Sequence, residues 1–63
     1  LSSAELRVME QIYKGKTEQE TARELFSSPN TVHQHVKSVY VKLGIHRLAD
    51  FIQYANKNNL FKN

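Results

Sequence analysis

Two helix-start signals follow one another closely in the middle of this chain, and their spacing constrains the fold more than any other feature. Thr17 stands three residues before Glu20, the spacing of a capping box in which each side chain binds a free backbone N–H of the helix end. Ser28 comes directly before Pro29, and a serine cap followed by proline at the first helical position also begins helices. We therefore expect two helices in immediate succession.

The connection between these two helices is very short. We predict helices over residues 17–25 and 29–43, which leaves only Phe26 to Ser28 as the link. Two helices joined by such a link pack at a steep angle, in the arrangement called a helix-turn-helix.

The helix predicted over residues 29–43 has an apolar side and a polar side. Its apolar residues recur at helical spacing and form a core stripe of Val32, Val36, Val39, Tyr40 and Leu43. The opposite side carries Asn30, His33, Gln34 and Lys37. Gly44 supplies the C-terminal stop. This helix therefore presents hydrogen-bonding side chains to solvent while its other side is buried.

Two further helices complete the predicted fold. Ser2 and Glu5 repeat the capping-box spacing and begin a helix over about residues 2–14, which ends at Gly15. The core stripe of that helix consists of Leu6, Met9, Ile12 and Tyr13. The fourth helix, over about residues 47–57, carries Leu48, Phe51, Ile52 and Ala55. Because no segment has the pattern of a strand, we predict an all-α four-helix bundle with a central helix-turn-helix.

Length and composition narrow the class of protein. The 63 residues allow one small domain, and the absence of cysteine excludes disulfides and thiolate metal sites. No apolar run is long enough for a membrane helix, so we expect no membrane contact and a cytoplasmic location. We also expect Leu60 and Phe61, the apolar residues of the tail, to fold back onto the domain.

The net charge of +3 is unevenly distributed. Residues 1–26 hold four basic and five acidic side chains, whereas residues 27–63 hold five basic ones and only Asp50 as an acid. A basic half on a small domain favours a polyanionic partner, although ordinary solvated surfaces show similar biases.

Many residues along the chain stand at the spacing of one known family. They are Leu1, Ser2, Glu5, Val8, Met9, Gly15, Thr17, Glu20, Ala22, Leu25, Ser28, Thr31, Val32, His35, Val39, Lys42, Leu43, Gly44 and Ile45. With these residues the chain resembles the LuxR-type (GerE-like) helix-turn-helix domain of bacterial transcription regulators. The resemblance implies that residues 1–63 form a winged-helix-like effector domain without a wing, the output domain of a response regulator. Because the chain begins at Leu1 rather than at methionine, we expect it to be a fragment that lacks any sensor domain, and the sequence leaves open what precedes Leu1.

Four positions depart from the family pattern. Thr21 stands where isoleucine is usual, and Phe26 stands where glycine is frequent in the turn. Val41 occupies a position that is usually charged. Leu48 occupies a position where arginine is common, and Arg47 lies one residue earlier.

The resemblance assigns the reading of DNA bases to the third helix, which lies in the major groove of double-stranded DNA. The base-reading positions correspond to His33, Gln34 and Lys37. Their chemistry suits the role, because glutamine pairs with adenine, lysine donates to guanine O6 and N7, and histidine donates or accepts. The alternative is a plain solvated helix face.

Other residues are candidates for contacts to DNA phosphates, which fix the register of the protein without reading sequence. The candidates are Thr17, Gln19, Ser28, Asn30, Thr31 and Lys42. Most of them lie at helix N-termini, where free N–H groups and the helix dipole favour anions. For Thr17 and Ser28, helix capping alone is the alternative explanation, and a residue can serve both purposes.

The fourth helix is a candidate surface for self-association. The resemblance implies pairing of domains through this helix, and we expect a weak homodimer through Leu48 and Ile52 that forms mainly on DNA. In the alternative, all apolar residues of the helix face the core of the monomer. The resemblance also implies RNA polymerase as a partner.

The sequence gives little support to an enzyme or a metal site. His33 and His35 point roughly 200° apart on one helix, so they cannot bind the same metal ion. His35 is better explained as a partly buried, hydrogen-bonded residue. The carboxylates Glu5 and Glu20 are explained as capping residues, and no nucleophile or glycine-rich phosphate loop is present. We expect no cofactor and no small-molecule ligand. The remaining alternatives are a protein-interaction module that has lost DNA binding, and a sigma-factor-like promoter-recognition domain.

Overall fold

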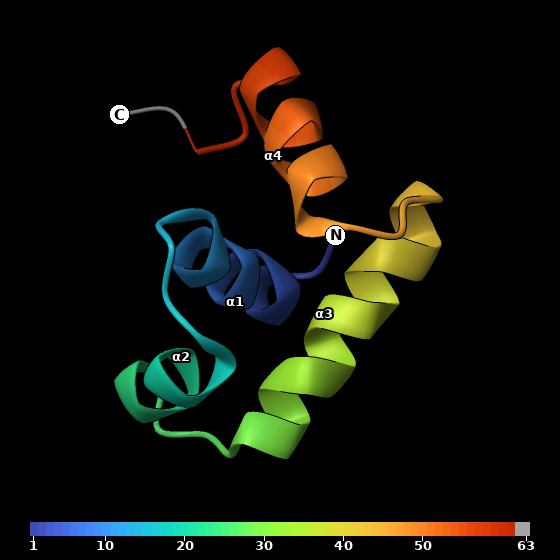
Figure 1. The fold of residues 1–63 in the computed structure, drawn as a ribbon. Helices are drawn as coiled ribbons and strands as arrows, with labels where there is room; N and C mark the ends of the chain where they lie inside the picture. Colours follow the sequence, from blue (N-terminus) through green and yellow to red (C-terminus); the bar gives the residue numbers. More distant parts are fainter. Residues whose placement is uncertain (62–63) are drawn as a thin grey trace.

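The computed structural model describes residues 1–61 and contains four helices over that part of the chain, without any strand. The helices are α1 (Ser3–Tyr13), α2 (Glu18–Glu24), α3 (Pro29–Leu43) and α4 (Leu48–Lys57). Figure 1 shows α1 in the middle of the molecule, α2 on one side of it and α4 on the other, with α3 running past α1. The predicted all-α architecture is confirmed, and the predicted helix bounds agree within one residue at each end.

Side-chain caps begin the first three helices, as the sequence predicts. In α1 the backbone N–H of Glu5 donates to Ser2 Oγ at 3.1 Å, and the N–H of Ser2 donates to Glu5 Oε1 at 2.8 Å. Thr17 and Glu20 form the same reciprocal pair at 3.0 and 2.9 Å at the start of α2. Each such cap stabilises its helix by about 1 kcal/mol, which matters for a helix as short as α2.

The third helix begins at a different kind of cap. Ser28 Oγ accepts from the N–H of Thr31 at 3.1 Å, and Pro29 occupies the first turn. At its other end Gly44 adopts φ +68°, the left-handed conformation that glycine takes without a Cβ penalty. In contrast, Arg47 at the start of α4 makes no side-chain cap.

The hydrophobic core draws on all four helices. Its buried members are Val8, Met9, Ile12, Ala22, Val32, Val36, Val39, Phe51 and Ala55. The predicted stripe of α3 is confirmed, since its three valines are buried and Tyr40 and Leu43 pack against the core at its edge. In α1 the predicted stripe omits Val8, which is the further buried apolar residue of this helix, and it includes Leu6, which is only half-buried.

Leu60 and Phe61 pack against the core, as predicted. The ring of Phe61 lies 5.3 Å from that of Tyr13 and 6.1 Å from that of Phe51, measured between centroids. The hydroxyl of Tyr13 donates to the side-chain oxygen of Asn56. These contacts tie α1 to α4 and to the tail.

The turn between α2 and α3 contains a residue in the left-handed conformation. Phe26 has φ +56°, and the following N–H, that of Ser27, donates back to the carbonyl of Ala22 at 2.8 Å. This is the backbone geometry in which helices usually end on glycine. The side chain of Phe26 is 97% exposed. The turn therefore keeps a conformation suited to glycine although phenylalanine occupies the position.

Thr21, another of the four residues that depart from the family pattern, lies in the core. Thr21 is fully buried, and its Oγ1 has no hydrogen-bond partner among the residues that the structure describes. Its methyl group fills space where isoleucine is usual, while its hydroxyl is desolvated without compensation.

Candidate nucleic-acid interface

The polar side of α3 is exposed along its N-terminal half. Asn30, His33, Gln34 and Lys37 are all exposed, as predicted from the helical spacing. The face continues past them to Val41, which is 81% exposed. Because Val32 and Val39 on the other side of the helix are completely buried, the orientation of this polar face is fixed by the core.

The predicted phosphate-contacting residues at the helix N-termini are also exposed. They are Thr17, Gln19, Ser28, Asn30 and Thr31. Thr17 and Ser28 act as caps, so the structural role foreseen for them is present. Ser28 Oγ also donates to Thr31 Oγ1 at 3.0 Å. The starts of α2 and α3 thus display hydroxyl and amide side chains beside the polar face of α3.

Lys42 differs from the other predicted phosphate contacts because its ammonium is engaged within the domain. Its Nζ lies 2.9 and 2.8 Å from the two carboxylate oxygens of Glu5, and Ser38 Oγ donates to the same carboxylate at 2.8 Å. Glu5 is buried, and its pKa is lowered to about 2, first by Lys42, then by the N–H of Ser2 and by Ser38. The capping role foreseen for Glu5 is therefore only part of its function, because Glu5 also ties α1 to α3.

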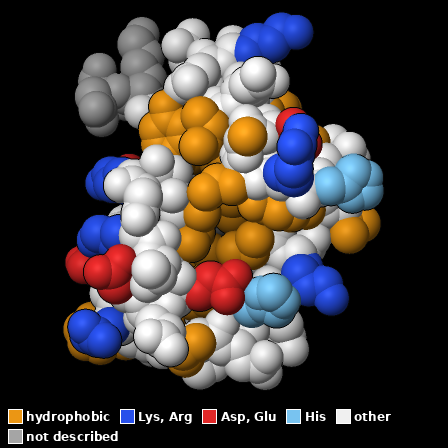
Figure 2. Space-filling model, viewed as in Figure 1, with side chains coloured by type: hydrophobic (Ala, Val, Ile, Leu, Met, Phe, Trp, Pro, Cys, Tyr) orange, Lys and Arg blue, Asp and Glu red, His pale blue; other side chains and the backbone are white. Residues whose placement is uncertain are grey.

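A second carboxylate contacts the predicted reading face itself. Glu18, the first residue of α2, places Oε2 3.0 Å from Nδ1 of His33. Both side chains remain partly exposed. Figure 2 shows a red acidic side chain against a pale blue histidine on the side of the molecule formed by α2 and α3. The sequence pattern does not predict this contact, because Glu18 and His33 lie on separate helices and 15 residues apart.

Lys37 is free of such a contact. No carboxylate lies within ion-pair distance of it in residues 1–61. Within residues 1–61, the polar face of α3 therefore presents one unpaired cation in Lys37, two amides in Asn30 and Gln34, and one histidine held by an acid.

The fourth helix divides its apolar residues between the core and the surface. Phe51 and Ala55 are buried in the core. Leu48 is 38% exposed, and Ile52 is half-buried and does not belong to the core cluster. The alternative in which all four residues face the core does not hold for Leu48, and the predicted dimer contact through Leu48 and Ile52 stays a prediction.

His35 agrees with its predicted role in part. It is half-buried and borders a surface hollow with Arg7, Val8 and Leu25. The predicted hydrogen bond of this histidine does not appear among the described residues. His35 therefore sits at the edge of the core without a polar partner there.

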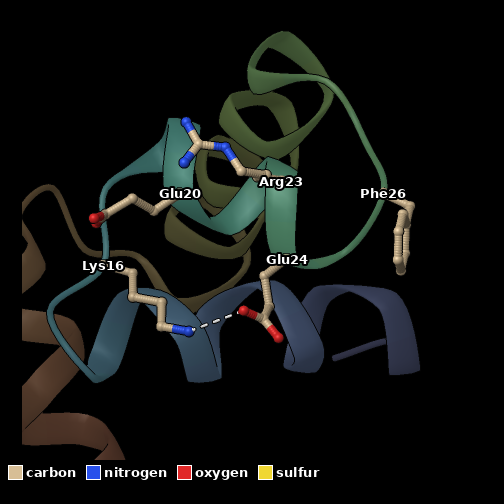
Figure 3. Close-up of a pocket in the computed structure, with 5 residues that line it drawn as sticks. All are labelled: Lys16, Glu20, Arg23, Glu24 and Phe26. Atoms are coloured by element: carbon tan, nitrogen blue, oxygen red, sulfur yellow. Dashed lines mark hydrogen bonds and ion pairs between the residues drawn. The ribbon is translucent and has the colours of Figure 1, made fainter.

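The remaining surface of residues 1–61 carries shallow hollows. One hollow, drawn in Figure 3, is lined by Lys16, Glu20, Arg23, Glu24 and Phe26. Lys16 Nζ pairs with Glu24 Oε1 at 3.3 Å, and the ring of Phe26 stands apart from the charged side chains. No group of three histidine, cysteine or acidic residues suited to a metal occurs within residues 1–61. None of the helices described combines the length and the apolar character that a membrane span requires.

The fold is that of a helix-turn-helix domain. It has a short capped helix in α2, then a tight turn, then the longer α3 with one buried and one polar side. Comparison with known proteins agrees, since a family described as bacterial regulatory proteins, luxR family, matches residues 1–55. The chain belongs to this family of transcription regulators, which is not a family of enzymes.

Curated relatives support the assignment. The chain is 32% identical over 60 residues to the Fimbriae Z protein of Salmonella typhimurium and 34% identical over 55 residues to that of Escherichia coli. It is 36% identical over 62 residues to the oxygen regulatory protein NreC of Staphylococcus aureus. These matches cover 95%, 87% and 98% of the chain but only 29%, 26% and 29% of the relatives, so the chain spans under a third of their length. No solved structure gave a significant match.

Proposed function

We propose that this domain binds double-stranded DNA in a sequence-specific manner, with α3 in the major groove. The observation that carries the proposal is the exposed polar face of α3, whose orientation is fixed by the completely buried Val32 and Val39. A helix presented in this way can enter the major groove and bring its N-terminal turns to the base edges. Membership of a family of bacterial regulators supports the same function.

Three side chains would read bases. Gln34 can pair with adenine through two hydrogen bonds, and the unpaired ammonium of Lys37 can donate to guanine. His33 would read through the ring nitrogen that Glu18 leaves free. These roles predict that each side chain affects binding at one base pair and leaves the rest of the site unchanged.

Phosphate contacts would fix the register of α3. Thr17 and Gln19 at the start of α2, with Ser28, Asn30 and Thr31 at the start of α3, present donors where the helix dipole favours an anion. Lys42 would contact a phosphate only in competition with Glu5. Because few phosphates are neutralised, we expect modest affinity that falls with increasing salt.

Two domains would pair on a two-fold symmetric site through Leu48 and Ile52 of α4. This proposal rests on the exposure of Leu48 and on the absence of Ile52 from the core cluster. Sedimentation of the domain, alone and with a duplex carrying two half-sites, tests it. We expect the domain to be a monomer without DNA and to bind as two domains per duplex, and a one-to-one complex at saturation would contradict pairing.

As a regulator in the cytoplasm, the whole protein would contact RNA polymerase at the promoter.

Selection of bound sequences from a random duplex pool tests the proposed function directly. We expect one enriched motif with two-fold symmetry.

A protein-interaction module without DNA binding is the second candidate function, and the 97% exposed ring of Phe26 in the turn favours it. Absence of any shift with random duplex at low salt would support the interaction module and contradict DNA binding.

A further inference from the structure

We propose that Glu18 is a specificity-determining positioning residue, which fixes the orientation and the tautomer of His33 and so decides which base His33 recognises. The inference rests on the proposed function, because His33 is taken to read a base. It goes beyond that function by assigning a role in recognition to a residue on α2 that need not touch the DNA bases.

The geometry holds the imidazole of His33 from one side. Glu18 Oε2 lies 3.0 Å from Nδ1, within ordinary hydrogen-bond distance. Glu18 is the first residue of a helix whose start is fixed by the reciprocal cap of Thr17 and Glu20. The carboxylate thus projects from an ordered helix end, and the contact reaches across the turn to the second turn of α3.

The chemistry of the contact determines where the proton of His33 resides. An ionised carboxylate only accepts hydrogen bonds, so Nδ1 must carry the proton. In the neutral ring Nε2 is then bare and acts as an acceptor. Without the carboxylate, the neutral ring is free to adopt either tautomer and can present Nε2–H as a donor.

The tautomer changes the base that fits. A bare Nε2 accepts from the exocyclic amino groups of cytosine or adenine, which are the major-groove donors. A protonated Nε2 instead donates to N7 or O6 of guanine or to O4 of thymine. While the ring is neutral, Glu18 therefore favours a base with an amino group opposite His33 and disfavours guanine and thymine, so selection and titration are carried out at a pH where the ring is neutral.

The negative charge of Glu18 has a separate and less specific effect. A carboxylate beside the proposed DNA face repels phosphates, so its removal raises the affinity for every sequence. Overall affinity and base preference must for this reason be measured separately.

The test compares the 63-residue chain with Glu18→Gln and with a matched control, Glu24→Gln. Glu24 is an acid of the same helix, but its partner is Lys16, so the control removes an equal charge without touching His33. Each protein is used for selection from a random duplex pool, followed by titration of single-base variants of the selected site. We expect Glu18→Gln to reduce the preference at one base pair about fivefold, the effect of one hydrogen bond, and Glu24→Gln to leave it unchanged.

His33→Ala identifies the base pair concerned. We expect it to abolish the preference at the same position, and Glu18→Gln to have no further effect in that background. If the wild-type chain selects a motif and Glu18→Gln keeps every base preference, this inference is wrong while the proposed function stands. If the wild-type chain selects no motif, the proposed function itself fails.

A spectroscopic measurement tests the tautomer without DNA. Nitrogen-15 chemical shifts of the His33 ring, recorded at a pH where the ring is neutral, distinguish a protonated Nδ1 from a protonated Nε2. We expect the proton on Nδ1 in the wild-type chain and a mixture of tautomers in Glu18→Gln, with unchanged helix content. A proton mainly on Nε2 in the wild-type chain would overturn the inference.

Discussion

Glu5 at the start of α1 binds Lys42 near the end of α3 through both of its carboxylate oxygens, at 2.9 and 2.8 Å. The same carboxylate caps α1 and accepts from Ser38. One buried acid therefore joins the first helix to the helix that is proposed to read DNA, so a change at Glu5 affects both helices.

The lowered pKa of Glu5 makes the stability of the domain depend on pH. Its pKa falls from the ordinary value of 4.5 to about 2 in the folded chain, chiefly because Lys42 binds the carboxylate. Stabilisation by this group is fully present above pH 4.5 and is lost as the pH falls toward 2. We expect the free energy of unfolding, measured with urea, to decrease over this range. Glu5→Gln should be less stable at neutral pH, and its free energy of unfolding should fall less steeply with decreasing pH. If this pH dependence were as steep as in the wild-type chain, Glu5 would not be the group responsible.

Removing the buried hydroxyl of Thr21 should stabilise the domain. Valine has nearly the same shape, so Thr21→Val keeps the packing and removes a desolvated Oγ1 that lacks a partner. We expect the free energy of unfolding to rise by about 1 kcal/mol. Thr31→Val serves as a control, because Thr31 is exposed and its Oγ1 accepts from Ser28 Oγ, so removal of this hydroxyl should give no gain. A loss of stability in Thr21→Val would show that the hydroxyl has a partner in solution.

Replacing Phe26 by glycine should also stabilise the domain. Glycine adopts φ +56° without the steric cost of a Cβ, and the 97% exposed ring has no packing to lose. We expect relief of this strain in Phe26→Gly to raise the free energy of unfolding by about 1 kcal/mol. The greater conformational entropy of glycine in the unfolded chain offsets part of this increase. Phe26→Ala retains the Cβ and should show no such increase. Equal effects of the two substitutions would contradict the assigned backbone strain.

Much of the fold follows from local features of the sequence. The caps at Ser2, Thr17 and Ser28 involve residues three apart, and the buried stripe of α3 follows from helical spacing alone. Such features are readable because backbone geometry fixes which neighbours along a helix can meet.

The contacts that the sequence pattern does not predict join separate helices. Lys42 lies 37 residues from Glu5, and His33 lies 15 residues from Glu18. Their meeting depends on how the helices pack, which no local pattern specifies. For the same reason the sequence predicts Lys42 only as a phosphate contact, whereas in the structure its ammonium binds Glu5.

The effect of Lys37→Ala on base discrimination tests most directly whether α3 reads DNA. Titration of the selected site and of its single-base variants with wild type and Lys37→Ala gives the discrimination at each position. We expect the variant to lose roughly 1 to 3 kcal/mol of discrimination at one base pair. Lys57→Ala, at the end of α4, removes an equal charge and should leave discrimination intact. An equal weakening of all sequences by Lys37→Ala would identify a phosphate contact and contradict base reading by this face of α3.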